Sequence, residues 1–107
     1  MTRFVVVACK PKAGMSEALE ALVRKHVSIL RSEGLASDRP VSAMRTADGT
    51  IVEVFEWNSA EAIQAAHSNA AVQALWGEFG AACDYVPLSQ IPEAQKLFAE
   101  FEPIELE

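Results

Sequence analysis

The stretch Ile51-Val52-Glu53-Val54-Phe55-Glu56-Trp57, followed at once by Asn58-Ser59-Ala60-Glu61-Ala62-Ile63, decides the class of fold. Its first part is mostly β-branched or aromatic and alternates in polarity, which predicts a strand. Asn58 then stands at the expected helix cap, and Glu61 three residues later completes a capping-box pattern. A strand that leads directly into a helix indicates a mixed α and β domain.

The residues before this strand predict a hairpin. Residues 41–46 alternate weakly, and Ala47-Asp48-Gly49-Thr50 separates them from residues 51–57. Asp-Gly between two extended runs is a strong hairpin signal, because tight hairpin turns need positive φ angles. We therefore expect residues 41–46 and 51–57 to be antiparallel neighbours.

The residues after the strand predict one helix that is broken or kinked at Ser68-Asn69, where the chain can cap afresh. Positions three or four residues apart form its inner stripe on both sides of the break. Those positions are Ala62, Ile63, Ala66, His67, Val72, Leu75, Trp76 and Phe79.

The N-terminal third predicts one strand and one long helix. Residues 4–9 form a valine-rich run, which indicates a strand buried on both faces and hence central in a sheet. Residues 15–32 carry an apolar stripe of helical spacing, and Gly34 stands where a left-handed residue ends a helix. The stripe includes His26, which has no special neighbour in the sequence and is interpreted as structural.

Residues 82–88 predict the last strand of the sheet, and Pro87 places it at an edge because proline donates no ladder hydrogen bond. Residues 17–22 and 61–66 are similar in sequence, as expected for two related halves. We therefore predict an α+β fold, ferredoxin-like βαββαβ with an antiparallel sheet. The length fits a single domain over residues 1–107 with its core at residues 3–88.

Residues 89–107 form a C-terminal extension beyond that fold. Pro92 suits the first turn of a short helix, and a sheet with both helices on one face leaves its other face bare. The large apolar side chains of the extension need a surface to bury against, and they are Phe98, Phe101, Ile104 and Leu106. We therefore expect a homodimer, with the extension packing at the dimer interface.

Composition and charge argue against several functional classes. The chain has 107 residues, 50% of them hydrophobic, and a formal net charge of −6. This charge argues against nucleic-acid binding, and no apolar run has the length of a membrane span or of a signal-peptide core. We therefore expect a cytoplasmic protein that binds neither nucleic acid nor membranes. The acidic charge is concentrated in residues 47–107, which indicates either a solvated face or a contact between subunits.

The two cysteines, Cys9 and Cys83, are predicted to be buried free thiols. The sequence holds no Cys/His cluster of zinc spacing, no phosphate-binding glycine loop and no nucleophile-elbow motif. We therefore expect neither a metal nor another cofactor.

Three short motifs resemble one known family. Lys10-Pro11-Lys12-Ala13-Gly14 resembles its turn after the first strand, and Arg31-Ser32-Glu33-Gly34 resembles the end of its first helix. The run from Glu53 to Ile63, followed by Ala66-His67, is similar to the strand-then-helix signature of the antibiotic biosynthesis monooxygenase-like domain. The resemblance covers about residues 3–88 and implies a dimeric α/β barrel, in which the sheets of two ferredoxin-like monomers pack face to face.

The family includes small monooxygenases that oxidise phenolic or quinol substrates without metal or flavin, and many members with no established activity. The resemblance therefore implies a cofactor-independent monooxygenase acting on a small aromatic, quinol or polyketide-like molecule. The family's usual second histidine, five residues after the first, is replaced here by Val72.

Oxygenation without a cofactor needs a base, a hydrogen-bond donor for the developing oxyanion and a dry aromatic pocket. His67 is the candidate base because it lies on the inner stripe at the expected helix break, and Asn69 is the candidate donor. The candidate substrate-binding residues are three pocket walls and one cation on the second strand, namely Trp57, Trp76, Phe79 and Arg45.

Ordinary structural roles account for the same residues. His67 fits the edge of a core, Asn69 fits a helix cap, and Trp76 and Phe79 fit core packing. The alternative function is a non-catalytic dimeric domain that binds a small molecule or has a stress-related role. A third alternative, haem binding, needs an axial ligand, for which His67 is the one plausible candidate.

Overall fold

The computed structural model describes residues 1–106; Glu107, the last residue of the expected extension, lies outside the described part. Within this range the chain forms an α+β fold with one five-stranded antiparallel sheet in the order β4-β1-β3-β2-β5. This order is consistent with a ferredoxin-like arrangement to which β5 is added at one edge. The elements in chain order are β1 (Arg3–Pro11), α1 (Ser16–Ser32), β2 (Ser42–Arg45), β3 (Ile51–Trp57), α2 (Ala60–Ala66), α3 (Ala70–Ala82), β4 (Cys83–Val86), two short 3₁₀ turns (Leu88–Gln90 and Pro92–Gln95) and β5 (Glu102–Pro103).

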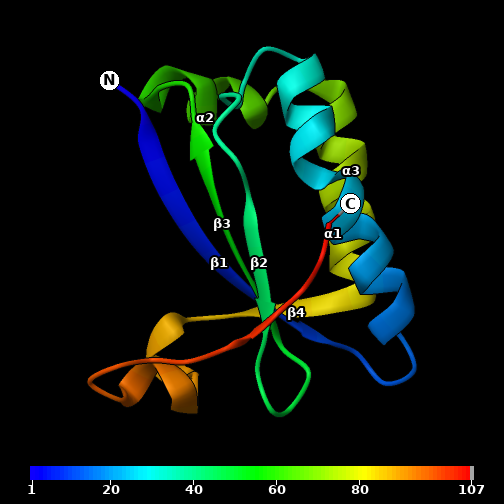
Figure 1. Ribbon diagram of the computed structural model, residues 1–107. Helices are drawn as coiled ribbons and strands as arrows, with labels where there is room; N and C mark the ends of the chain where they lie inside the picture. The colour runs from blue at the N-terminus through cyan, green and yellow to red at the C-terminus, as the bar shows by residue number, and fades with distance from the viewer. Residues whose placement is uncertain (107) are drawn as a thin grey trace.

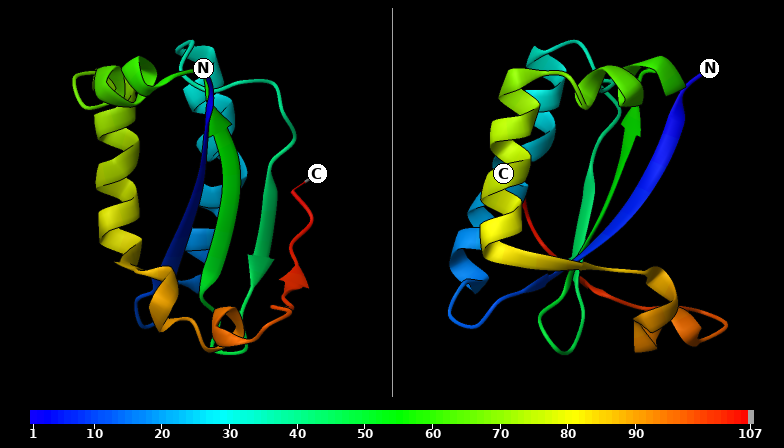
Figure 2. Two further views of the ribbon diagram at one scale, coloured as in Figure 1. Left: turned by 90° about the vertical axis from the view of Figure 1, so that its left-hand side faces the viewer. Right: turned by 180° about the vertical axis from the view of Figure 1, so that it is seen from behind.

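The long helices α1 and α3 lie side by side on one face of the sheet, here called the inner face (Figure 1). The apolar stripe of α1 is buried as predicted, and the helix ends before Gly34, whose φ of +74° is the left-handed conformation expected there. The helices α1 and α3 therefore form a second layer that covers the central strands β1 and β3 (Figure 2).

The β2–β3 hairpin forms at the predicted Asp-Gly turn. Gly49 has a φ of +90°, and the Thr46 amide donates to the Thr50 carbonyl at 2.9 Å. Asp48 accepts hydrogen bonds from the Thr46 hydroxyl and the Thr50 amide, and these bonds lower its pKa to about 2. The turn therefore fixes the register in which Met44 lies opposite Val52 and Arg45 opposite Ile51.

One predicted helix cap needs correction, and the predicted helix break is confirmed. The cap of α2 is Ser59, whose side chain accepts from the Ala62 amide at 3.0 Å, whereas Asn58 donates to the Gly34 carbonyl. The break at Ser68-Asn69 is confirmed and is complete, so that α2 and α3 are two separate helices. Asn69 caps the second of them, because its side chain satisfies the Val72 amide that has no partner in the first helical turn.

The prediction that the first strand is buried on both faces is wrong for its N-terminal half. β1 is a central strand, between β4 and β3, but Phe4 and Val6 on its outer face are 62% and 42% exposed. The C-terminal half of that face is covered instead by the extension, where Ile91 packs on Ala8 and Val52. An apolar run does not show whether a second layer covers both of its faces.

The extension runs across the sheet and back along its edge. Its two 3₁₀ turns form a hook on the side of the sheet away from the helices (Figures 1 and 2), and β5 then pairs with β2. Ile104 is buried and Phe101 packs on the sheet of its own chain, whereas Leu97 and Phe98 are 94% and 82% exposed.

No helix within residues 1–106 is both long enough and apolar enough to cross a membrane.

Candidate functional site

A pocket of about 300 Å³ opens between the inner face of the sheet and the helices α1 and α3. The pairing of Val5 with Phe55 and of Val7 with Glu53 puts alternate residues of both central strands on this face. The lining residues from the strands are Val5, Val7, Cys9, Glu53, Phe55, Trp57 and Tyr85, and those from the helices are His26, Trp76 and Phe79. The wall is therefore mostly aromatic and aliphatic, with few polar groups.

The most polar feature of this pocket is a buried pair formed by His26 and Glu53. The two residues are 7% and 2% exposed, and His26 Nδ1 lies 2.6 Å from Glu53 Oε1. The imidazole is held edge-on against Phe55 and Phe79, with ring centroids 5.2 Å and 5.0 Å away. With an ionised Glu53 as the acceptor, Nδ1 is the donor of this hydrogen bond, and the neutral form of the imidazole then carries its free lone pair on Nε2.

The second carboxylate oxygen of Glu53, Oε2, and the second ring nitrogen of His26, Nε2, have no hydrogen-bond partner within residues 1–106. Glu53 Oε2 is buried without a hydrogen-bond partner, the single such side-chain oxygen or nitrogen within residues 1–106. His26 Nε2 makes no hydrogen bond within the same residues, and it is not sealed from solvent as Oε2 is. An imidazole oriented by a carboxylate, with its second nitrogen free, is the arrangement of a general base.

Tyr85 supplies a further polar group at the pocket. It stands on the edge strand β4 and is 55% exposed, yet partial burial raises its pKa to about 12, with a smaller contribution from the charge of Glu53. A tyrosine hydroxyl is protonated at neutral pH even at its ordinary pKa, so Tyr85 can donate a hydrogen bond to a ligand oxygen.

Cys9 and Cys83 are both free and buried, as predicted. They lie on the neighbouring strands β1 and β4, and burial raises the pKa of both thiols above the ordinary value. Since the thiolate is the nucleophilic form, Cys9 contributes an unreactive apolar surface to the pocket.

The structure brings three of the predicted site residues together. Trp57, Trp76 and Phe79 line the pocket from β3 and α3. Trp57 and Phe79 are also buried core residues, so each packs the core and forms the wall at once.

The other three predicted site residues do not line the pocket. His67 is exposed at the end of α2, where its Nδ1–H donates to the Ile63 carbonyl at 2.9 Å and its ring packs against Trp76. Asn69 is occupied as the cap of α3, and its amide donates to Glu33. These contacts are the ordinary structural roles that helix ends give to such residues.

Arg45 is also placed elsewhere. It projects from β2 toward α1, and its guanidinium lies 3.6 Å from a carboxylate oxygen of Glu20. This pair lies beside β2, so Arg45 does not reach the pocket lining.

Sequence reasoning missed His26 and Glu53, which are separated by 27 positions along the chain. A signal was present in each element: Glu53 occupies an inward position between Ile51 and Phe55, and His26 occupies the buried stripe of α1. A charged residue at a core position needs a buried partner, which makes such positions candidates for a site.

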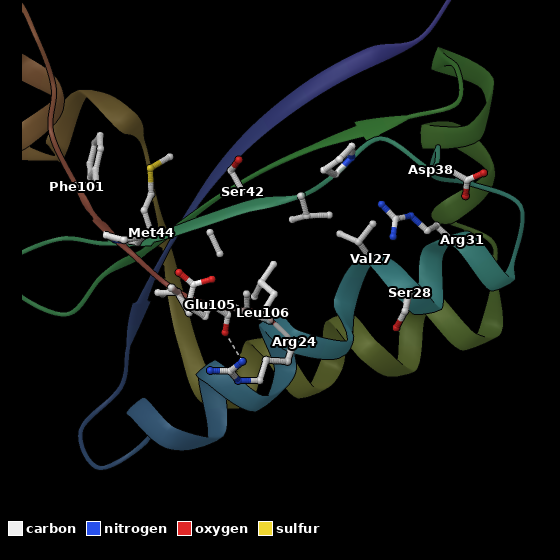
Figure 3. Close-up of a pocket in the computed structure, with 16 residues that line it drawn as sticks. Arg24, Val27, Ser28, Arg31, Asp38, Ser42, Met44, Phe101, Glu105 and Leu106 are labelled. Atoms are coloured by element: carbon white, nitrogen blue, oxygen red, sulfur yellow. Dashed lines mark hydrogen bonds between the residues drawn. The ribbon is translucent and has the colours of Figure 1, made fainter.

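A second hollow, an open groove of about 770 Å³, runs between α1, β2 and the C-terminal segment (Figure 3). Its arginines are already engaged by backbone carbonyls: Arg24 donates to Glu105, and Arg31 donates to Ser37 and Arg39 at 2.7 Å each. The groove offers no pair of acid and base, and we take the aromatic pocket as the candidate site.

Within residues 1–106 no group of three or more histidine, cysteine or acidic side chains is placed to hold a metal ion. Comparisons of the chain with protein-family models, with curated proteins and with solved structures found no match. The case for a function therefore rests on the geometry of the pocket and on the motifs in the sequence.

Proposed function

We propose that this protein is a cofactor-independent monooxygenase acting on a small aromatic or quinol-like substrate, with His26 as its base. The observation that carries the proposal is the His26–Glu53 pair at the wall of an aromatic pocket. Burying a carboxylate and an imidazole in an apolar core is costly to the fold, which is typical of groups kept for chemistry.

The chemistry starts with a proton transfer. A phenolic hydroxyl donates its proton to His26 Nε2, and Glu53 stabilises the imidazolium through Nδ1–H. The resulting phenolate is electron-rich enough to pass an electron to O₂, and recombination forms a carbon–oxygen bond. In the net reaction of a phenol with a free para position, the para C–H becomes a carbonyl, the phenolic C–OH becomes the second carbonyl of a quinone, and the other oxygen atom leaves as water. On a quinol the oxygen enters at a free ring C–H, the product is a hydroxyquinone, and the other oxygen atom again leaves as water.

The remaining lining residues support these steps. Trp57, Trp76 and Phe79 offer flat faces to an aromatic ring and exclude water from the reactive anion. Tyr85, whose hydroxyl is protonated at neutral pH, offers a hydrogen bond to the oxyanion. The motifs at residues 10–14 and 53–63 that resemble the antibiotic biosynthesis monooxygenase-like domain support the same class of reaction.

We also propose that the protein acts as a homodimer. The outer face of β1 exposes Phe4 and Val6, and the extension exposes Leu97 and Phe98 after its second 3₁₀ turn. Monomers rarely leave so many large apolar side chains in water, and a second copy related by a two-fold axis covers both surfaces at once.

The test of the catalytic proposal is oxygen uptake on a panel of naphthols, quinols and anthrone-like phenols, with His26→Gln compared against the wild type. General-base catalysis is worth roughly 10²–10⁴ in rate, so this substitution is expected to reduce kcat by about that factor. His67→Gln separates the two histidines, because a base at His67 predicts the same loss there and a base at His26 predicts none.

Full activity of His26→Gln would remove His26 from the mechanism. Absence of uptake by the wild type on the whole panel, together with tight binding of the same compounds, would instead support the non-catalytic small-molecule-binding domain.

A further inference from the structure

We propose, resting on the function above, that the pocket accepts only neutral hydroxyarenes and rejects analogues that carry a carboxylate, and that Glu53 imposes this selection. The inference comes from the charges around the pocket, which are independent of the proton transfer itself.

The pocket has a fixed negative group and no fixed positive one. Glu53 is the carboxylate in its lining, and no lysine or arginine stands among the lining residues described in positions 1–106. Glu53 Oε2 has no hydrogen-bond partner, so no donor other than His26 offsets the charge of this side chain. A second carboxylate would therefore lose water while it faces an uncompensated negative charge.

Two cations of the surrounding elements are paired with other carboxylates, whereas Arg3, opposite Trp57 on β1, is exposed and does not line the pocket. Arg45 lies 3.6 Å from Glu20, and Lys25 on α1 lies 3.2 Å from Glu78 on α3. Recruiting either of them to a ligand would break an existing pair, so they do not serve as a counter-charge in the pocket.

The proposed reaction keeps the charge of the site constant, which explains how a site built in this way still stabilises an anion. When the hydroxyl proton moves to His26 Nε2, the phenolate and the imidazolium appear together, and the total charge of the pocket does not change. A carboxylate on the ring adds a negative charge that no proton transfer cancels. The pocket therefore rejects a carboxylate on the ring, whereas the hydroxyl that reacts enters uncharged and is accepted.

Binding can be measured at this site alone. The chain has two tryptophans, Trp57 and Trp76, and both line the pocket, so the intrinsic fluorescence of the protein reports on its occupancy. The ligands are 2-naphthol, 6-hydroxy-2-naphthoate and the methyl ester of that acid, measured without oxygen. The carbon para to each hydroxyl is a ring-fusion carbon without hydrogen, so these compounds report binding and are not substrates of the para oxidation. The ester is the matched control, since it has the bulk of the carboxylate without its charge.

We expect 2-naphthol and the ester to bind with similar Kd values and the acid to bind at least about tenfold more weakly at pH 7. Glu53→Gln removes the charge, so the Kd values of the acid and the ester are expected to differ by no more than about threefold in this variant. Glu53→Asp keeps the charge and is expected to retain the ratio. Each readout is the Kd of the acid divided by the Kd of the ester for the same variant. A substitution that weakens the binding of both ligands equally therefore leaves this ratio unchanged.

Equal affinity of the wild type for acid and ester would overturn the selection, and so would an unchanged ratio in Glu53→Gln. The outcome is separate from that of the proposed function. Oxygen uptake on both neutral and acidic phenols would refute the selection and leave the monooxygenase proposal intact. Selective binding of neutral ligands without oxygen uptake would refute the monooxygenase proposal and leave the selection intact.

Discussion

Replacing His26 and Glu53 by apolar residues, singly and together, tests whether this pair exists for the fold or for the site. His26→Leu leaves the Glu53 carboxylate at 2% exposure with no partner on either oxygen, because Oε1 loses the imidazole and Oε2 has none within the described residues. Glu53→Met leaves an imidazole that can stay neutral. The double variant His26→Leu/Glu53→Met removes both polar groups and fills similar space.

The expected magnitudes follow from the burial of the pair. Removing the hydrogen-bond partner of a buried charge leaves that charge uncompensated and costs about 3–5 kcal/mol, so His26→Leu is expected to lose that much stability. Glu53→Met is expected to lose about 1–3 kcal/mol, since the remaining imidazole forfeits one hydrogen bond. Replacing a whole buried pair by apolar side chains is neutral or stabilises by roughly 1–4 kcal/mol, so the double variant is expected to equal or exceed the wild type.

Thermal unfolding at one fixed protein concentration measures these differences. For a domain of this size 1 kcal/mol shifts the Tm by roughly 4–8 °C, so His26→Leu is expected to melt at least about 12 °C below the wild type. The double variant is expected to recover that loss. A double variant whose loss equals the sum of the single losses would refute the reasoning, because additive losses mean that the two side chains do not stabilise each other.

Four further substitutions probe other parts of the molecule. Phe98→Ser is expected to shift the mass in solution toward one chain without lowering the stability of the monomer, whereas Phe101→Ser, which unpacks the sheet of its own chain, is expected to lower it; light scattering and urea unfolding distinguish the two. Asn69→Ala is expected to cost about 0.5–2 kcal/mol in urea unfolding through the lost cap of α3 and to leave oxygen uptake unchanged, and a fall in kcat would restore Asn69 to the site. Asp48 has a folded pKa of about 2 against an ordinary 3.8, so its hydrogen bonds stabilise the fold above pH 3.8 and are lost as the pH falls through 2; the stability deficit of Asp48→Ala at pH 7 should therefore vanish in acid, and a deficit that persists at pH 1.5 would contradict this assignment.

The sequence by itself determined the local elements, because each depends on short-range physics. The spacing of the apolar residues in residues 15–32 defines α1, and the Asp-Gly turn defines the β2–β3 hairpin. The helix break at Ser68-Asn69 also follows from a local competition, since Asn69 satisfies a free backbone amide better at a new cap than inside a helix. The same locality explains the error at Asn58, where two adjacent cap-forming residues compete and only the exit of the chain from β3 selects Ser59.

Only the tertiary structure decided which inward residues meet. The pattern of β3 marks Glu53 as inward and the pattern of α1 marks His26 as inward, but their contact depends on the register of β3 with β1 and on where α1 crosses the sheet. The same limit applies to His67, which continues the stripe of α2 in sequence but falls beyond the end of that helix and outside the pocket. Periodicity encodes the direction of a side chain relative to its own element, whereas a site requires the relative placement of elements that are distant in the chain, and long-range packing sets that placement.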